Sequence, residues 1–77
     1  MLAEDKVLDC SGLSCPMPVV KTSRAIKEVA VGQVLKMIAT DSGAPADMDA
    51  WARQTGNQLL GSFNQDGKYI FYIQRTK

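Results

Sequence analysis

The chain has 77 residues, of which 45% are hydrophobic and 22% charged, and its net charge is +1. A chain of this length and composition predicts one small folded domain over residues 1–77. Its near balance of charge argues against a general attraction to nucleic acid or to anionic membranes. With two cysteines and no histidine, it lacks Cys/His nucleophile pairs and the ligands of an ordinary zinc site, so we expect neither a metal nor a cofactor.

The first residues of the chain give an expectation about its location. Residues 1–6 include acids where a secretory signal peptide would carry an apolar stretch. The apolar runs elsewhere are only a few residues long, too short to span a membrane. We therefore expect a cytoplasmic protein, in which a disulfide between Cys10 and Cys15 would be transient or regulatory rather than structural.

The first third of the chain predicts a strand, a loop and a helix. Residues 6–10 have the composition of a short buried strand, and residues 11–14 form a loop in which Gly12 is free to adopt a positive φ. From Pro16 the pattern becomes helical, and Gly32 ends this segment. The predicted inner face of the helix carries Val19, Ser23, Ile26 and Ala30, and the outer face carries Lys21, Arg24 and Glu28.

The middle of the chain repeats this alternation. Residues 33–40 predict a strand, and residues 41–43 supply a turn and a helix cap. Pro45 suits the first turn of a second helix, and Gly56 is placed to end it in a left-handed cap. The predicted buried face of this helix consists of Ala44, Met48, Trp51, Ala52 and Thr55.

The last third predicts a β-hairpin. Two strand segments, residues 57–63 and 68–73, are joined by residues 64–67, which close with Asp-Gly. The order of elements is therefore βαβαββ. Right-handed crossovers place both helices on one face of the sheet. We expect an α/β (α+β) fold, a two-layer sandwich with a four-stranded mixed sheet.

The run Cys15-Pro16-Met17-Pro18 carries the chemistry. If Cys15 is the helix cap, Pro16 and Pro18 occupy the first and third helical positions, where proline is tolerated. The nearest free backbone N–H groups, of Met17 and Val19, could then face the sulfur. A helix start favours the anion, so we expect a lowered pKa of the Cys15 thiol.

The neighbours of this thiol restrict the reaction. No histidine is present to act as a general base, and Asp9, if close, would raise the thiol pKa. Ester or amide hydrolysis is therefore disfavoured. Attack on a persulfide or disulfide of another molecule needs no such base, because the leaving group is already a good one. The product would be a Cys15 persulfide that the helix start also stabilises.

Residues 9–18, DCSGLSCPMP, resemble the signature of the TusA-like (SirA/YedF-type) sulfur-carrier family. The resemblance extends over nearly the whole chain, including the strand end at Thr40-Asp41 and the closing hairpin. It implies the same βαβαββ sandwich and a cysteine that carries sulfane sulfur. The sulfur-bearing position of the family corresponds to Cys15. The supporting positions of the motif correspond to Asp9, Gly12, Pro16 and Pro18.

The resemblance also implies partner proteins. The donor would be of the cysteine desulfurase or rhodanese type and the acceptor of the DsrE type, in a sulfur relay toward tRNA thiolation, cofactor synthesis or sulfur oxidation. This describes a sulfurtransferase-type persulfide carrier rather than a stand-alone turnover enzyme. Met17, Lys21 and Arg24 are candidates for partner docking, although a charged helix face is also compatible with simple solvation.

Cys10 leaves a second hypothesis open, because it is not part of the family motif. As the last residue of a strand it could be an inert core residue. It could also form a reversible disulfide with Cys15, in which case the protein would be a redox-regulatory binding module. A third hypothesis, direct binding of nucleic acid, is disfavoured by the charge.

Overall fold

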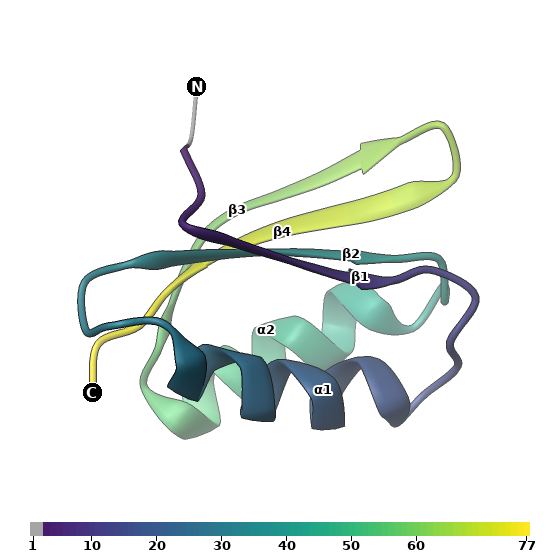
Figure 1. Ribbon diagram of the computed structural model, residues 1–77. Coiled ribbons are helices and arrows are strands. Elements are labelled where there is room, and N and C mark those ends of the chain that lie inside the picture. The colour runs from purple at the N-terminus through teal and green to yellow at the C-terminus, as the bar shows by residue number, and fades with distance from the viewer. Residues whose placement is uncertain (1–2) are drawn as a thin grey trace.

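The computed structural model describes residues 3–77, and it has a sheet in one layer and helices in the other (Figure 1). Both helices cover the same face of the sheet. The elements in chain order are β1 (Lys6–Cys10), α1 (Met17–Ala25), the 3-10 turn η1 (Ile26–Glu28), β2 (Val34–Ala39), α2 (Ala44–Thr55), β3 (Gln58–Gln65) and β4 (Lys68–Gln74). The predicted βαβαββ sandwich is confirmed.

The sheet has four strands in the order β1-β2-β4-β3. Strands β1 and β2 are parallel, with Leu8 opposite Met37, whereas β4 is antiparallel to both β2 and β3. Because β1 and β2 are parallel, their carboxyl ends lie at the same edge of the sheet. The segments that lead into α1 and α2 therefore begin side by side, and this arrangement positions the candidate site.

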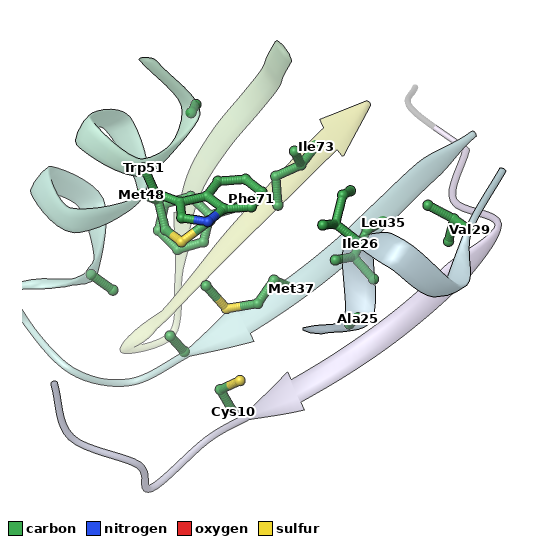
Figure 2. Close-up of a cluster of buried hydrophobic side chains, with 13 residues drawn as sticks. Cys10, Ala25, Ile26, Val29, Leu35, Met37, Met48, Trp51, Phe71 and Ile73 are labelled. Atoms are coloured by element: carbon green, nitrogen blue, oxygen red, sulfur yellow. The ribbon is translucent and has the colours of Figure 1, made fainter. Parts of the chain in front are cut away.

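The core lies between the two layers (Figure 2). Alternate residues of β2 and β4 point toward the helices, and α2 covers them with Met48 and Trp51. The buried strand residues are Cys10, Leu35, Met37, Ala39, Phe71 and Ile73. The predicted buried face of α2 is confirmed except for Thr55, which is exposed in the last turn and donates its hydroxyl to the Trp51 carbonyl.

The inner face of α1 differs from the predicted one. Ile26 is buried and Val19 and Ser23 are half-buried, but Ala30 is exposed and Thr22 is fully buried. The regular helix ends at Ala25, and the tighter η1 turn that follows changes the direction in which later side chains point. A buried threonine is compatible with this core because its hydroxyl donates to the carbonyl of Pro18.

The hairpin turn is shorter than the sequence predicted, and the start of α2 lacks the predicted side-chain cap. The hairpin turns at Asp66 and Gly67, both with positive φ, so residues 64 and 65 still belong to β3. Positive φ at both central residues is typical of a type I′ turn, whose twist matches that of the strands.

At the start of α2 no side chain caps the helix, contrary to the cap expected from residues 41–43. Gly56 does end α2 in the left-handed conformation.

The two helices are short. In the part of the chain from residue 3 onward, none is long and apolar enough to cross a membrane.

Candidate functional site

The candidate site lies where the chain leaves β1 and β2 at their shared edge. The loop after β1 carries Gly12 and Cys15, and Thr40 follows β2. The Gly12 N–H donates to the Thr40 hydroxyl at 2.8 Å, which fixes one loop to the other. Gly12 has a φ of +80°, a conformation that side chains other than glycine rarely adopt. The position of Cys15 therefore depends on two segments far apart in the sequence.

The helix begins one residue later than predicted. Its N-cap is Pro16 rather than Cys15, so Pro18 is at the second helical position and not the third. The Met17 N–H donates to the Ser14 carbonyl at 2.9 Å and not to the sulfur. A tight turn thus precedes the helix, and the peptide bond between Cys15 and Pro16 is cis. Cys15 therefore precedes the N-cap residue instead of being that residue.

The Cys15 thiol is free and exposed. The pKa of the Cys15 thiol is raised above the ordinary value, first by its interaction with the Asp47 side chain, and also by desolvation and the charges of Asp47 and Asp41. The lowered pKa that the sequence predicted is therefore wrong for the isolated chain. The charges of Asp47 and Asp41 disfavour the thiolate, which accounts for the direction of this shift.

Sequence reasoning missed both carboxylates, although a signal for them exists. Asp41 is the second residue after β2, and Asp47 lies in the first turn of α2. A β-carbon placed on Gly43 would lie 3.5 Å from Oδ2 of Asp41 and 3.7 Å from Oδ2 of Asp47. The two carboxylates thus converge on one side of the glycine. Parallel pairing of β1 with β2 brings this turn to the edge where Cys15 lies, and the βαβ pattern already predicts that pairing.

Asp9, which belongs to the sequence motif, has a local structural contact. Its Oδ1 accepts the backbone N–H of Ser11 at 2.9 Å, which stabilises the turn after β1. Hydrogen bonding to Ser11 lowers the pKa of the Asp9 carboxyl. The charge of Asp9 acts on the Cys10 thiol, whereas the carboxylates that act on Cys15 are Asp41 and Asp47.

Cys10 lies in the core although it is only five residues from Cys15. It is 0% exposed, and Figure 2 shows it among the buried apolar side chains. Burial is the main reason that the pKa of its thiol is raised. The structure has both cysteines as free thiols. Cys10 is therefore placed as a core residue, one of the two alternatives that the sequence left open.

A groove runs between the edge strand β1 and α1, and its lining includes Met17, two residues after Cys15. Its volume is about 530 Å³. Val7, Met17 and Val20 expose apolar surface there, with exposures of 51%, 41% and 37%. The full lining is Lys6, Val7, Leu8, Met17, Val20, Lys21, Arg24, Ala25 and Glu28.

The charges of this groove are predominantly positive. Lys6 is paired with Glu28 at 2.9 Å, which neutralises one end. Lys21 and Arg24 are exposed, and neither belongs to an ion pair among residues 3–77. The three residues predicted for docking, Met17, Lys21 and Arg24, therefore line one surface next to the thiol. Pro16 is exposed close by, whereas Pro18 is buried and belongs to the packing of α1.

Residues 3–77 contain no group of three or more cysteine and carboxylate side chains that could hold a metal ion.

Comparison with known proteins identifies the family. The family described as sulfurtransferase TusA matches the chain over residues 6–75. A "Sulfur carrier protein TusA" from Allochromatium vinosum is 44% identical over 94% of this chain and 95% of its own length. A "Putative sulfur carrier protein" from Aquifex aeolicus is 53% identical over 95% of this chain, which spans only 37% of that protein.

A solved structure agrees in fold. The SirA-like protein from Desulfitobacterium hafniense superposes with a TM-score of 0.81 at 22% identity, covering 94% of this chain and 99% of that one. At that identity the likeness supports the fold alone, whereas the match to the family rests on sequence. The chain belongs to the TusA sulfurtransferase family, as its DCSGLSCPMP motif indicated.

Proposed function

We propose that this protein is a sulfur carrier that holds sulfane sulfur as a persulfide on Cys15. The observation that carries the proposal is the exposed Cys15 thiol at the start of α1, in a chain of the TusA family, while Cys10 is enclosed in the core. Only Cys15 is then accessible to the sulfur atom of another protein. Similarity to proteins named sulfur carriers supports the same assignment.

The transfer step needs no external oxidant or reductant. The Cys15 sulfur, as thiolate, attacks the terminal sulfur of a partner persulfide, R–S–SH. A new S–S bond forms on Cys15, and the S–S bond of the partner breaks. The electron pair of that bond leaves with R–S⁻, which takes up the proton that Cys15 lost. The products are the Cys15 persulfide and R–SH, and the reverse exchange with another thiol unloads the carrier.

The groove beside Cys15 is the docking surface in this proposal. Its apolar residues Met17 and Val20 lie on the same helix as Lys21 and Arg24. A donor of the cysteine desulfurase or rhodanese type and an acceptor of the DsrE type would each place an apolar surface with acidic residues against it. Complementary charge speeds such encounters and orients the partners. The pathways proposed for the sulfur are tRNA thiolation, cofactor synthesis or sulfur oxidation.

Mass spectrometry after incubation with a sulfane-sulfur donor tests this function. The wild-type chain is expected to gain one sulfur, about 32 Da, on the peptide that contains Cys15. Cys15→Ser should lose this gain, and Cys10→Ala should keep it as the matched control. A sulfur retained in Cys15→Ser, or lost in a folded Cys10→Ala, would contradict the proposal.

The same measurement detects the redox-switch alternative. A Cys10–Cys15 disulfide would lower the mass by two hydrogen atoms, about 2 Da, because forming it is a two-electron oxidation, and it would require both cysteines. The complete burial of Cys10 gives that alternative no support. Sulfur gain without a disulfide is therefore the expected result.

A further inference from the structure

The sheet has two free edges, and they differ. Among residues 3–77, β1 pairs only with β2, and β3 only with β4. The register of β3 shifts between Leu59 and Gly61, whereas β1 runs along β2 without a shift. Bulges, prolines and charged side chains keep a sheet edge from pairing with another chain. Strand β1 has no bulge and no proline, and its one lysine, Lys6, is neutralised by Glu28. The β1 edge is therefore the one open to a further strand.

The groove between β1 and α1 uses this free edge as one wall. Three consecutive residues of β1, Lys6, Val7 and Leu8, line it. Successive side chains of a strand point to opposite faces of the sheet, so three residues in a row line one groove along the edge of the strand. At such an edge, alternate residues direct their backbone N–H and C=O groups away from the sheet. The wall thus offers hydrogen-bonding groups of the main chain.

One stripe of helical residues forms the opposite wall. Its lining residues recur three and four positions apart, which is the spacing of a single helix face. They are Met17, Val20, Lys21, Arg24 and Ala25 of α1, followed by Glu28 of η1. Met17 and Val20 expose apolar surface, and the two cations belong to no ion pair among residues 3–77. This wall is therefore apolar and positively charged.

The two ends of the groove are different. At one end Lys6 of β1 pairs with Glu28 at 2.9 Å, which joins the two walls. At the other end lies Met17, the first residue of α1 and only two residues after Cys15. A chain segment that occupies the groove would therefore have one of its ends at the start of α1, on the side of the reactive motif.

A strand added to this edge would meet different surroundings on its two faces. On the helix side lie Lys21 and Arg24, which favour carboxylates. Leu8 packs against the core, so its neighbour Val7 points to the opposite face of the sheet, where it is 51% exposed. Side chains placed beside Val7 would be apolar, since cross-strand apolar pairs stabilise a sheet. The edge therefore favours a segment in which acidic and apolar residues alternate.

We propose that an extended segment of the partner protein, with alternating acidic and apolar residues, binds in this groove as a fifth strand hydrogen-bonded to the free edge of β1. Main-chain hydrogen bonds supply affinity in this binding mode, and alternate side chains supply specificity. A second copy of the chain would instead bring a second pair of the cations Lys21 and Arg24 to the same edge, which like charge disfavours. The inference specifies how a partner uses the docking surface, so it rests on the proposed function.

The test is a titration followed by NMR of the backbone amides, with the peptide acetyl-Glu-Val-Glu-Val-Glu-Val-amide as the probe. Saturable shifts are expected at Lys6, Val7 and Leu8 and along the α1 wall, with a Kd of about 1 mM. The variant Lys21→Glu/Arg24→Glu should weaken binding about tenfold or more. Lys27→Glu, outside the groove lining, is the control for net charge and should bind as the wild type does.

Two methylated forms of the peptide test the backbone pairing in the wild-type chain. One carries N-methyl groups on every glutamate amide, and the other on every valine amide. Only alternate residues of a strand donate to a given neighbour. One methylated peptide should therefore bind about tenfold more weakly than the parent peptide, and the other should bind about as well. An equal effect of the two methylations would overturn the proposal, because attraction between charges treats both peptides alike.

Three further results would also count against a fifth strand. These are shifts confined to α1 with none in β1, equal weakening by Lys27→Glu, and the same β1 shifts on concentrating the chain without peptide, which would assign the edge to a second copy. The titration is repeated with Cys15→Ser, where unchanged shifts are expected. Since no sulfur is transferred, a negative result here leaves the persulfide assay unaffected, and a failed persulfide assay leaves this binding result unaffected.

Discussion

Cys10 and Cys15 have the same side chain and lie five residues apart, yet the fold places them in opposite environments. Cys10 ends β1 and is enclosed between the sheet and the helices, where it packs as a small apolar residue. Cys15 lies beyond the turn and is exposed. Both thiols have a raised pKa, but burial is the main cause for one and Asp47 for the other. Accessibility, more than the direction of the pKa shift, distinguishes the exposed Cys15, the proposed sulfur-bearing residue, from the buried Cys10.

Alkylation under native conditions should show the largest difference between the two thiols. Cys15 is expected to react with iodoacetamide at least about 100-fold faster than Cys10, because a buried thiol reacts only when the chain opens. In urea that unfolds the chain, the two rates should become similar. Peptide mass spectrometry assigns each modification. Comparable native rates would show that the enclosure of Cys10 is not maintained in solution.

Serine substitution should lower the free energy of unfolding more at Cys10 than at Cys15. Cys10→Ser places a hydroxyl among apolar side chains and should lower the free energy of unfolding by about 1–3 kcal/mol. Cys15→Ser, at an exposed position, should change it by less than about 0.5 kcal/mol. Urea unfolding followed by tryptophan fluorescence measures both. An equal loss for the two variants would contradict the distinction.

Reversing charge in the groove should affect only reactions that need a docked partner. With a protein persulfide donor, the double variant Lys21→Glu/Arg24→Glu is expected to load sulfur about tenfold more slowly, because rim charges act mainly on association rates. Loading from inorganic polysulfide should change much less. Lys27→Glu, in the η1 turn outside the groove lining, is the control for net charge. If Lys27→Glu slows loading equally, the effect is due to net charge, and the groove is not the docking surface.

The buried cysteine should contribute to the loss of stability at alkaline pH. Since burial raises the pKa of Cys10, the native state holds that proton more tightly than the unfolded chain does. Its stabilising contribution is complete below the ordinary thiol pKa and is lost as pH rises through the native value. The urea concentration at the unfolding midpoint should therefore decrease between pH about 7 and pH about 10. This decrease should be larger in the wild type than in Cys10→Ala. Equal falls in the two proteins would contradict this assignment.

The smallest expected effect concerns the hydrogen bond that fixes the Cys15 loop. Thr40→Val removes the acceptor of the Gly12 N–H and should cost about 0.5 kcal/mol, because water can replace this exposed contact. The Gly12 amide should exchange with solvent several-fold faster, as measured by NMR. Thr40→Ser keeps the hydroxyl and is the matched control. If Thr40→Ser and Thr40→Val exchange alike, the loop is held by other contacts.

Much of the fold could be predicted because its signals are local. The strand-like run of residues 33–40 predicted β2, helical spacing predicted α2, and Gly56 marked the end of that helix, all within windows of a few residues. The errors arose where a distant contact or a local turn prevailed. A tight turn from Ser14 to Met17 moved the start of α1, and the η1 turn changed the inner face after Ala25.

By itself, the sequence determined the order of elements, the family and an accessible cysteine at the start of a helix, because the motif, the periodicity and the prolines are read along the chain. Only the tertiary structure decided the electrostatic state of that cysteine. Parallel pairing of β1 with β2 brings Asp41 and Asp47, more than 25 residues downstream in the sequence, to the Cys15 thiol. A thiol pKa depends on charges close in space, so the helix start alone could not predict its direction.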